Sequence, residues 1–309
     1  MQRRDLIKQA PAALLGATLA ACGGGNAADE PKPTFVFVHG AWHGSWCWSL
    51  VVEALGARGF PAIALDLPGH GMEARVPVSY KTQDLAALAT EPSPLAGLGL
   101  ADYRDRVLAV VRGLKAAGAG PLVLVGHSLG GATLSAVGEA APELIHQLVY
   151  LTAFCPVSLS TVLAYLEAPS FSTSEVPSLF AADPVASRCL RINHDATDAP
   201  YRARCKSAFY ADVDDAAFDS VANLLTPDEP MRAFTDTVVP TAARWGRVPR
   251  AYIRCGLDRA FPLAAQDQMI AEADAFTPQN RFSQLTLATS HSPFLSNPPA
   301  LVDALVSLT

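Results

Sequence analysis

The chain has few charged residues and no cluster of positive charge after its first residues. Only 17% of its 309 residues are charged, and 23 Lys and Arg stand against 29 Asp and Glu, for a net charge of −6. No run of Lys or Arg occurs beyond residue 8. A nucleic-acid partner requires a basic surface that neutralises phosphates. The composition therefore predicts no nucleic-acid binding.

Metal-binding spacings and internal repeats are also lacking. No Cys-x-x-Cys pair occurs, and no combination of Cys and His has the spacing of a zinc site. The six cysteines need another explanation. Cys47, Cys155 and Cys255 lie in apolar segments, which predicts buried, inert thiols. Cys189 and Cys205 lie in polar, irregular sequence and are the candidate disulfide pair.

The N-terminal segment predicts export. A basic stretch over 1–8 precedes a short apolar stretch over 10–21, which is too short to span a bilayer, so 1–21 is predicted to be a signal peptide. "LAAC" at 19–22 resembles a bacterial lipobox, in which Cys22 would be lipidated. The alternative is an ordinary cleaved signal with a chance cysteine. Residues 22–33 would then form a lipidated, flexible tether. We expect a periplasmic lipoprotein, whether exported by the twin-arginine or the general route.

Strand-length apolar runs alternate with helical patterns from residue 34 onward. Near-continuous apolar strands are typical of a parallel sheet buried on both faces, and the alternation predicts a doubly wound, mainly parallel α/β fold. The predicted strands are 34–39, 61–66, 121–126, 144–152, 250–255 and 282–288, and the predicted helices are 46–58, 102–118, 129–141, 263–275 and 298–308.

This alternation stops between about 156 and 247. The segment contains Pro, Ser and Asp clusters with short helical pieces, and an insertion of this length is rarely a bare loop. We expect a mainly helical cap over 156–247, lying above the carboxyl ends of the strands, where open α/β sheets bind ligands. The core would comprise 34–155 and 248–309.

The stretch "GHSLG" at 126–130 lies between a predicted strand and a predicted helix. This context is typical of a G-x-S-x-G turn, in which a strained serine is exposed above the sheet at the positive end of a helix. The alternative is a Gly-rich turn with an incidental serine. The pattern makes Ser128 the candidate nucleophile.

A serine nucleophile needs a histidine base that is oriented by an acid. His291 follows the last predicted strand, where this fold places the histidine. Asp258 is the first carboxylate after the 250–255 strand, whereas later carboxylates lie on a helix face. A capping histidine and a surface aspartate are the alternative readings of these two residues.

Acyl transfer also requires two backbone N–H groups that bind the oxyanion. The turn itself supplies Leu129 N–H. The loop "HGAWHGSW" at 39–46 follows the first strand, and its Gly40 allows close approach, which makes Ala41 N–H the second candidate. The loop can also be described as a Gly-rich turn with a stacked aromatic patch, and this description is compatible with an oxyanion donor at Ala41.

Six segments together carry a resemblance to a known family. They are "FVFVHGAWHGSWCW", "LDLPGHG", "GHSLGGAT", "LVYLTAFCP", "RAYIRCGLDRAFPLAAQDQMI" and "SHSPFLSNP". From about residue 34 to the C-terminus the chain resembles the α/β-hydrolase branch that holds plant methyl-salicylate-type esterases, hydroxynitrile lyases and bacterial pyrethroid-hydrolase-like carboxylesterases. The resemblance implies the triad Ser128, Asp258 and His291, the oxyanion donors Ala41 and Leu129, and no cofactor.

The branch includes more than one chemistry. Its hydroxynitrile lyases carry threonine where this chain has Gly40, and they carry a cyanide-stabilising lysine where it has Ser292. Ester hydrolysis is therefore favoured over cyanide elimination, and a complete triad favours it over a non-catalytic, membrane-anchored ligand-binding relative. An apolar cap suggests small to medium uncharged or aromatic esters, with Gly40, Trp42 and Phe154 as candidate substrate contacts. The sequence gives no indication of the oligomeric state.

Overall fold

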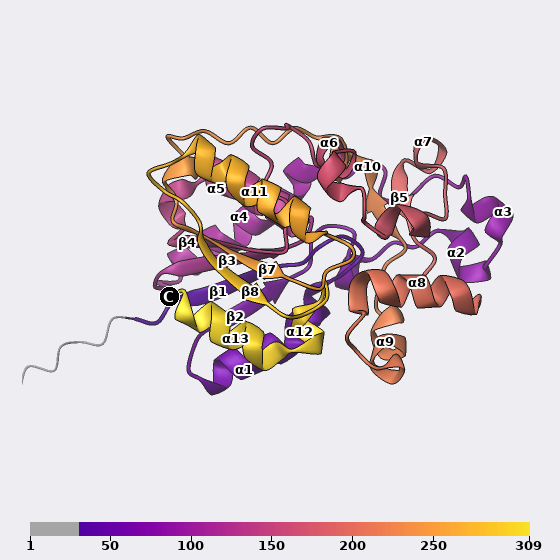
Figure 1. Ribbon diagram of the computed structural model, residues 1–309, viewed down its shortest axis with the longest axis horizontal. Helices are drawn as coiled ribbons and strands as arrows, with labels where there is room; N and C mark the ends of the chain where they lie inside the picture. The colour runs from indigo at the N-terminus through magenta and orange to yellow at the C-terminus, as the bar shows by residue number, and fades with distance from the viewer. Residues whose placement is uncertain (1–30) are drawn as a thin grey trace, which may run out of the picture. The chain divides into compact units, whose positions relative to one another are not determined.

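A six-stranded parallel sheet forms the centre of the computed structural model, which describes residues 31–309 (Figure 1). Its strand order is β2-β1-β3-β4-β7-β8, and every neighbouring pair is parallel. The predicted α/β class with a mainly parallel sheet is confirmed. The strands are β1 (Thr34–Val38), β2 (Ala62–Leu65), β3 (Leu122–His127), β4 (Gln147–Leu151), β7 (Arg250–Cys255) and β8 (Ser283–Leu287).

Burial of the central strands explains why their sequences are apolar along their whole length. Every residue of β1, β3 and β4 is buried, because helices cover both faces of the sheet. One face carries α4, α5 and α11, and the other carries α1, α12 and α13 (Figure 1). These helices are α1 (Ser49–Ala57), α4 (Leu100–Ala116), α5 (Gly130–Ala140), α11 (Leu263–Phe276), α12 (Pro293–Ser296) and α13 (Pro298–Ser307).

The segment between β4 and β7 is mainly helical but includes a small antiparallel sheet. Strands β5 (Cys189–Arg191) and β6 (Asp228–Pro230) pair with each other, and this sheet was not predicted. Core and cap lie within one compact unit, Lys32–Thr309. The helices of the cap are α6 (Val162–Leu166), α7 (Pro184–Ser187), α8 (Ala199–Tyr210), α9 (Asp215–Ala222) and α10 (Met231–Thr235).

A second segment, 78–91, packs against this cap. It contains α2 (Val78–Thr82) and α3 (Leu85–Leu88), which lie near β5 and α8 (Figure 1). The buried guanidinium of Arg191 joins the two segments, because it donates to the carbonyl oxygens of Leu88 (2.7 Å) and Glu91 (3.0 Å). The layer above the sheet is therefore built from two stretches of the chain.

Some expectations fall outside the described part of the chain. The predicted signal peptide, Cys22 and the tether up to residue 30 lie there. Among residues 31–309, no helix combines the length and apolarity needed to cross a membrane. Within the same range, no cluster of three or more His, Cys, Asp or Glu is arranged to hold a metal ion.

Candidate active site

Ser128 occupies the sharp turn that joins β3 to α5. Its φ is +52°, a left-handed conformation that residues with side chains rarely adopt. The turn packs closely on the first loop, since a Cβ placed on Gly130 would lie 2.6 Å from the carbonyl oxygen of His39. Glycine at 130 is therefore required. The serine hydroxyl stands at the N-terminal, positive end of α5.

His291 and Asp258 form a hydrogen-bonded pair. They follow the neighbouring strands β8 and β7, whose carboxyl ends lie at the same edge of the sheet. His291 Nδ1 lies 2.6 Å from Asp258 Oδ2. Asp258 Oδ1 accepts from the backbone N–H groups of Ala260 (2.8 Å) and Phe261 (2.7 Å). These bonds hold the carboxylate, and through it the imidazole, in one orientation.

Thr152 is a fourth hydrogen-bond partner in this group that the sequence reasoning did not find. Its hydroxyl donates to Asp258 Oδ2 at 2.6 Å, and its φ is +38°. Thr152 directly follows β4, the strand beside β7. A threonine at the end of a strand carries no signal of its own in the sequence, although its hydroxyl can orient a carboxylate that follows the neighbouring strand.

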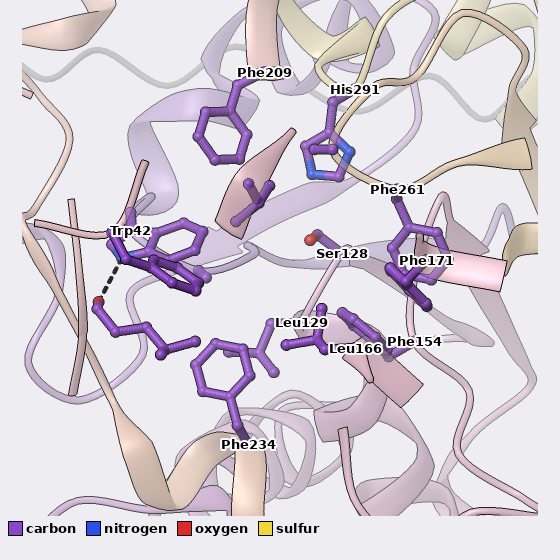
Figure 2. A pocket seen from close by; sticks show the side chains of 15 residues that line it. Trp42, Ser128, Leu129, Phe154, Leu166, Phe171, Phe209, Phe234, Phe261 and His291 are labelled. Atoms are coloured by element: carbon purple, nitrogen blue, oxygen red, sulfur yellow. Dashed lines mark hydrogen bonds between the residues drawn. The ribbon is translucent and has the colours of Figure 1, made fainter. Parts of the chain in front are cut away.

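Ser128 and His291 line the same pocket. Figure 2 shows Ser128 among the lining side chains with the His291 ring beside it. In residues 31–309, no hydrogen bond joins Ser128 Oγ to the imidazole. Catalytic contacts of this kind are often long without substrate and shorten in the substrate complex. The arrangement thus brings the three predicted triad residues to one site.

The residues that carry the two predicted oxyanion donors line this pocket as well. Ala41, in the loop after β1, and Leu129, the residue before α5, both line it. Neither backbone N–H has a hydrogen-bond partner among the described residues. Buried N–H groups are almost always paired. Two unpaired donors beside a strained serine therefore form a site that can accept a negatively charged oxygen.

Apart from Ser128 and His291, every residue lining the pocket is apolar or aromatic. The enclosed space is about 30 Å³, enough for one or two water molecules. The Phe154 and Phe171 rings are stacked, with centroids 5.4 Å apart, and the Phe261 ring meets each of them edge-on at 4.7 Å. An ester can enter only if such side chains shift. The remaining lining residues are Ala41, Trp42, Leu129, Leu166, Val176, Phe180, Leu190, Phe209, Phe234 and Ala260.

The three predicted substrate contacts lie in different surroundings. Trp42 and Phe154 line the pocket, and the Trp42 ring lies on the side opposite the phenylalanines, with its Nε1 donating to the Leu190 carbonyl at 3.0 Å (Figure 2). Gly40 does not line the pocket. A Cβ there would lie 2.8 Å from Ser128 Cβ, so this glycine permits the close contact between first loop and turn.

Three buried histidines surround the site without carrying charge at neutral pH. Burial lowers the pKa of His39 to about 4 and that of His43 to about 3. Burial and the nearby His291 lower the pKa of His127 far below its usual value. His127 Nε2 lies 2.9 Å from the His291 carbonyl oxygen. These rings are therefore packing and hydrogen-bonding groups around the predicted base.

The predicted disulfide is wrong. Cys189 and Cys205 are both buried free thiols. Cys189 lies in β5 beside Ser187 and Asp228, whereas Cys205 lies in α8 beside Tyr201, so each thiol has its own surroundings. Burial raises the pKa of Cys189 to about 12 and that of Cys205 to about 11. The other cysteines lie inside the core, as expected for inert thiols: Cys47, Cys155 and Cys255.

Comparison with known proteins finds esterases among the relatives of this chain. A methylesterase of Arabidopsis thaliana, Methylesterase 18, is 27% identical over 282 residues, covering 88% of this chain and 95% of the plant protein. A probable esterase of Oryza sativa subsp. indica is 37% identical over 124 residues, and the match spans 40% of each chain. The chain thus spans well under half the length of this rice relative.

A solved structure shares the fold of this chain, and a family model assigns the chain to a family. The pyrethroid hydrolase of Sphingobium faniae JZ-2 has the same fold, with a TM-score of 0.70 and 24% identity over 89% of this chain and 96% of that one. The model of the alpha/beta hydrolase family matches residues 35–304, nearly the whole described chain. These matches extend across both core and cap, and the chain belongs to the alpha/beta hydrolase family.

Proposed function

We propose that this protein is a serine hydrolase that cleaves carboxylic esters through an acyl-enzyme on Ser128. The observation that carries the proposal is the meeting of three features at one site. They are the strained Ser128, the hydrogen-bonded His291–Asp258 pair, and the unpaired N–H groups of Ala41 and Leu129. Each provides a function that acyl transfer requires.

The mechanism follows from these positions. His291 Nε2 takes the Ser128 proton as Oγ attacks the ester carbonyl, and Asp258 stabilises the resulting imidazolium. The backbone N–H groups of Ala41 and Leu129 bind the oxyanion of the tetrahedral intermediate. The alcohol leaves with the proton from His291. A water molecule, deprotonated by the same imidazole, then attacks the acyl-enzyme, and the His291 imidazolium returns that proton to Ser128 Oγ as the acid is released.

The apolar pocket supports small to medium, uncharged or aromatic esters as substrates. No lining residue is Lys, Arg, Asp or Glu, so a charged acyl or alcohol group would lose its hydration without gaining a partner. The cluster of Phe154, Phe171 and Phe261 offers an aromatic surface. The names of the relatives, methylesterase and pyrethroid hydrolase, are consistent with this class.

Two other functions are less well supported. Cyanide elimination would need a cation near the leaving group, but Ser292 follows His291 and no cationic side chain lines the pocket. A ligand-binding relative without catalysis would not need the Ser128, His291 and Asp258 arrangement or the free N–H groups. Both alternatives predict that the protein does not hydrolyse esters.

The test compares the purified protein with single variants on a short-chain nitrophenyl ester. Ser128→Ala and His291→Ala should lose nearly all turnover while keeping the wild-type melting temperature. Ser135→Ala is the matched control, because this buried α5 serine bonds Tyr150 and does not line the pocket. Wild-type turnover in Ser128→Ala, or none in a folded wild type on a panel of esters, would overturn the proposal.

We also propose that the hydrolase is an exported lipoprotein that contacts the membrane only through its N-terminal lipid. The basic 1–8 stretch, the short apolar run and the "LAAC" sequence at 19–22 support this. In a bacterial host, the wild type should fractionate with membranes and Cys22→Ser should not. Mass spectrometry of the N-terminal peptide separates lipidation from simple cleavage. Equal membrane recovery of both proteins, with no lipid on Cys22, would contradict the proposal.

A further inference from the structure

Glu229 is a buried carboxylate outside the triad. It lies in β6 of the cap and is 1% exposed. Three donors converge on it: the Tyr103 hydroxyl at 2.6 Å, His70 Nε2 at 2.9 Å and the backbone N–H of Trp42 at 3.1 Å. A buried carboxylate is costly unless it is fully hydrogen-bonded, so this position must serve a purpose that an apolar residue would not.

The surroundings keep Glu229 ionised. Burial alone would raise its pKa, but the charge of His70 and the hydrogen bonds lower the pKa of Glu229 below its ordinary value. Burial likewise opposes protonation of His70, yet Glu229 raises the pKa of that imidazole. The backbone N–H of Trp42 is therefore bonded to a charged oxygen, which is the stronger kind of hydrogen bond.

Trp42 needs such a partner, because its backbone is strained. Its φ is +63°, in the left-handed region that large side chains avoid. Three further bonds to the cap hold the same residue. The Trp42 carbonyl accepts from the Thr226 N–H at 2.8 Å and from the Thr226 hydroxyl at 3.2 Å, and the Trp42 indole N–H donates to the Leu190 carbonyl at 3.0 Å. The cap thus fixes this loop residue from several sides.

The bond from Glu229 fixes a peptide next to the predicted oxyanion donor. The peptide linking Ala41 to Trp42 is held at both ends, because its N–H bonds Glu229 and its carbonyl accepts from His43 Nδ1 at 2.7 Å. The preceding peptide has its carbonyl on Gly40, which accepts from His39 Nδ1 at 2.8 Å. The N–H of that preceding peptide is the unpaired donor of Ala41, a residue that lines the pocket.

We propose that Glu229 is a positioning residue for the oxyanion hole. Its carboxylate accepts from the N–H of the Ala41–Trp42 peptide, holds the strained Trp42 backbone in place and thereby aims the Ala41 N–H at the reacting carbonyl. Because Glu229 belongs to the cap, the hole is complete only when the cap is seated on the first loop. This inference rests on the proposed ester hydrolysis and adds a residue that touches neither Ser128 nor the pocket.

Two substitutions at this position and one at its neighbour form the test. Glu229→Met keeps the length of the side chain but accepts no hydrogen bond, and Glu229→Gln offers one carbonyl oxygen to three donors. The control is Asp228→Asn. Asp228 is equally buried in the same strand, but it pairs with Arg191 (2.6 and 2.8 Å) and does not touch the first loop.

The readouts are kcat and KM on a nitrophenyl ester, the melting temperature, and the rate at which an alkyl fluorophosphonate labels Ser128. Loss of an entire oxyanion donor costs about 100- to 1,000-fold in kcat, so a misaimed donor should cost roughly 30-fold in Glu229→Met and about 5-fold in Glu229→Gln. The labelling rate should fall with kcat, and KM should stay within about 3-fold. Asp228→Asn should lower the melting temperature and leave both rates unchanged.

Each outcome decides the inference. Wild-type kcat and labelling in Glu229→Met would mean that Glu229 only anchors the cap, and equal losses in Asp228→Asn would mean the same. If Glu229→Met does not fold, the comparison is made with Glu229→Gln, and unchanged rates there overturn the proposal. If the wild type hydrolyses no ester, the proposed function fails, but the labelling rates still test whether Glu229 aims the donor.

Discussion

His194 should make the folded protein sensitive to acid, and its replacement should remove part of that sensitivity. The ring is 4% exposed, and neither of its nitrogens has a hydrogen-bond partner among the described residues. Burial lowers the pKa of His194 to about 3, whereas an imidazole in an unfolded chain titrates at about 6.5. Unfolding below pH 6.5 therefore takes up a proton at this position.

The magnitude follows from proton linkage. Because the folded pKa is depressed, the unfolded state binds more protons, and the free energy of unfolding falls as pH decreases from about 6.5 toward 3. One pKa unit corresponds to about 1.36 kcal/mol, so at pH 5 His194 costs roughly 2 kcal/mol relative to pH 7.5. Folded proteins typically have a free energy of unfolding of about 5–15 kcal/mol, so a loss of this size is readily measurable.

Urea unfolding of wild type and His194→Leu, followed by tryptophan fluorescence at pH 7.5, 6.5, 5.5 and 5.0, measures this contribution. The stability of the variant relative to wild type should rise by about 2 kcal/mol between pH 7.5 and 5.0. His146→Leu, at an exposed position, is the control and should keep the wild-type slope. Parallel stability curves for wild type and His194→Leu would refute the reasoning, because they would show that His194 binds no extra proton on unfolding.

Three further predictions concern the site and its supports. Thr152→Val removes one of four donors to the triad carboxylate and should lower kcat about 10-fold without changing far-UV circular dichroism. Gly130→Ala places a Cβ 2.6 Å from a backbone oxygen and should destabilise the fold by about 1–3 kcal/mol. Gly113→Ala is the control on α4, where the space is open, and it should stabilise the fold by about 0.5–1 kcal/mol. The melting temperatures of the two variants should therefore move in opposite directions, and two unchanged melting temperatures would contradict the prediction. Alkylation in denaturant without reductant should modify Cys189 and Cys205. If neither cysteine is modified, the two form a disulfide in the protein after all.

The core could be predicted because its signals are local and long. Strands such as 121–126 and 250–255 are continuous apolar runs, and the structure places β3 and β7 within one residue of them. The β5–β6 pair could not be predicted in this way. Its strands have three residues each and include Arg191, Asp228 and Glu229, which suggest a solvated loop. Their burial depends on partners far away in the sequence.

The site residues likewise divide into those with a local sequence signal and those whose partners lie far away in the sequence. Ser128, Asp258 and His291 could be located because each follows a recognisable strand in the order that this fold requires. Thr152 also follows a strand, but a threonine there has no distinctive sequence pattern. Glu229 lies 187 residues from the backbone N–H that it holds, and no spacing rule connects the two. The disulfide prediction failed because polar local sequence does not show that a cysteine is exposed.

The position of Thr152 also has a consequence for redesign of the triad. Its hydroxyl and the His291 imidazole both bond the same oxygen of Asp258, so the space occupied by that oxygen can be reached from the end of β4 as well as from the loop after β7. A carboxylate at 152 would be repelled by an ionised Asp258, because like charges this close disfavour each other. An acid supplied from β4 could therefore serve His291 only in a protein that lacks the Asp258 carboxylate.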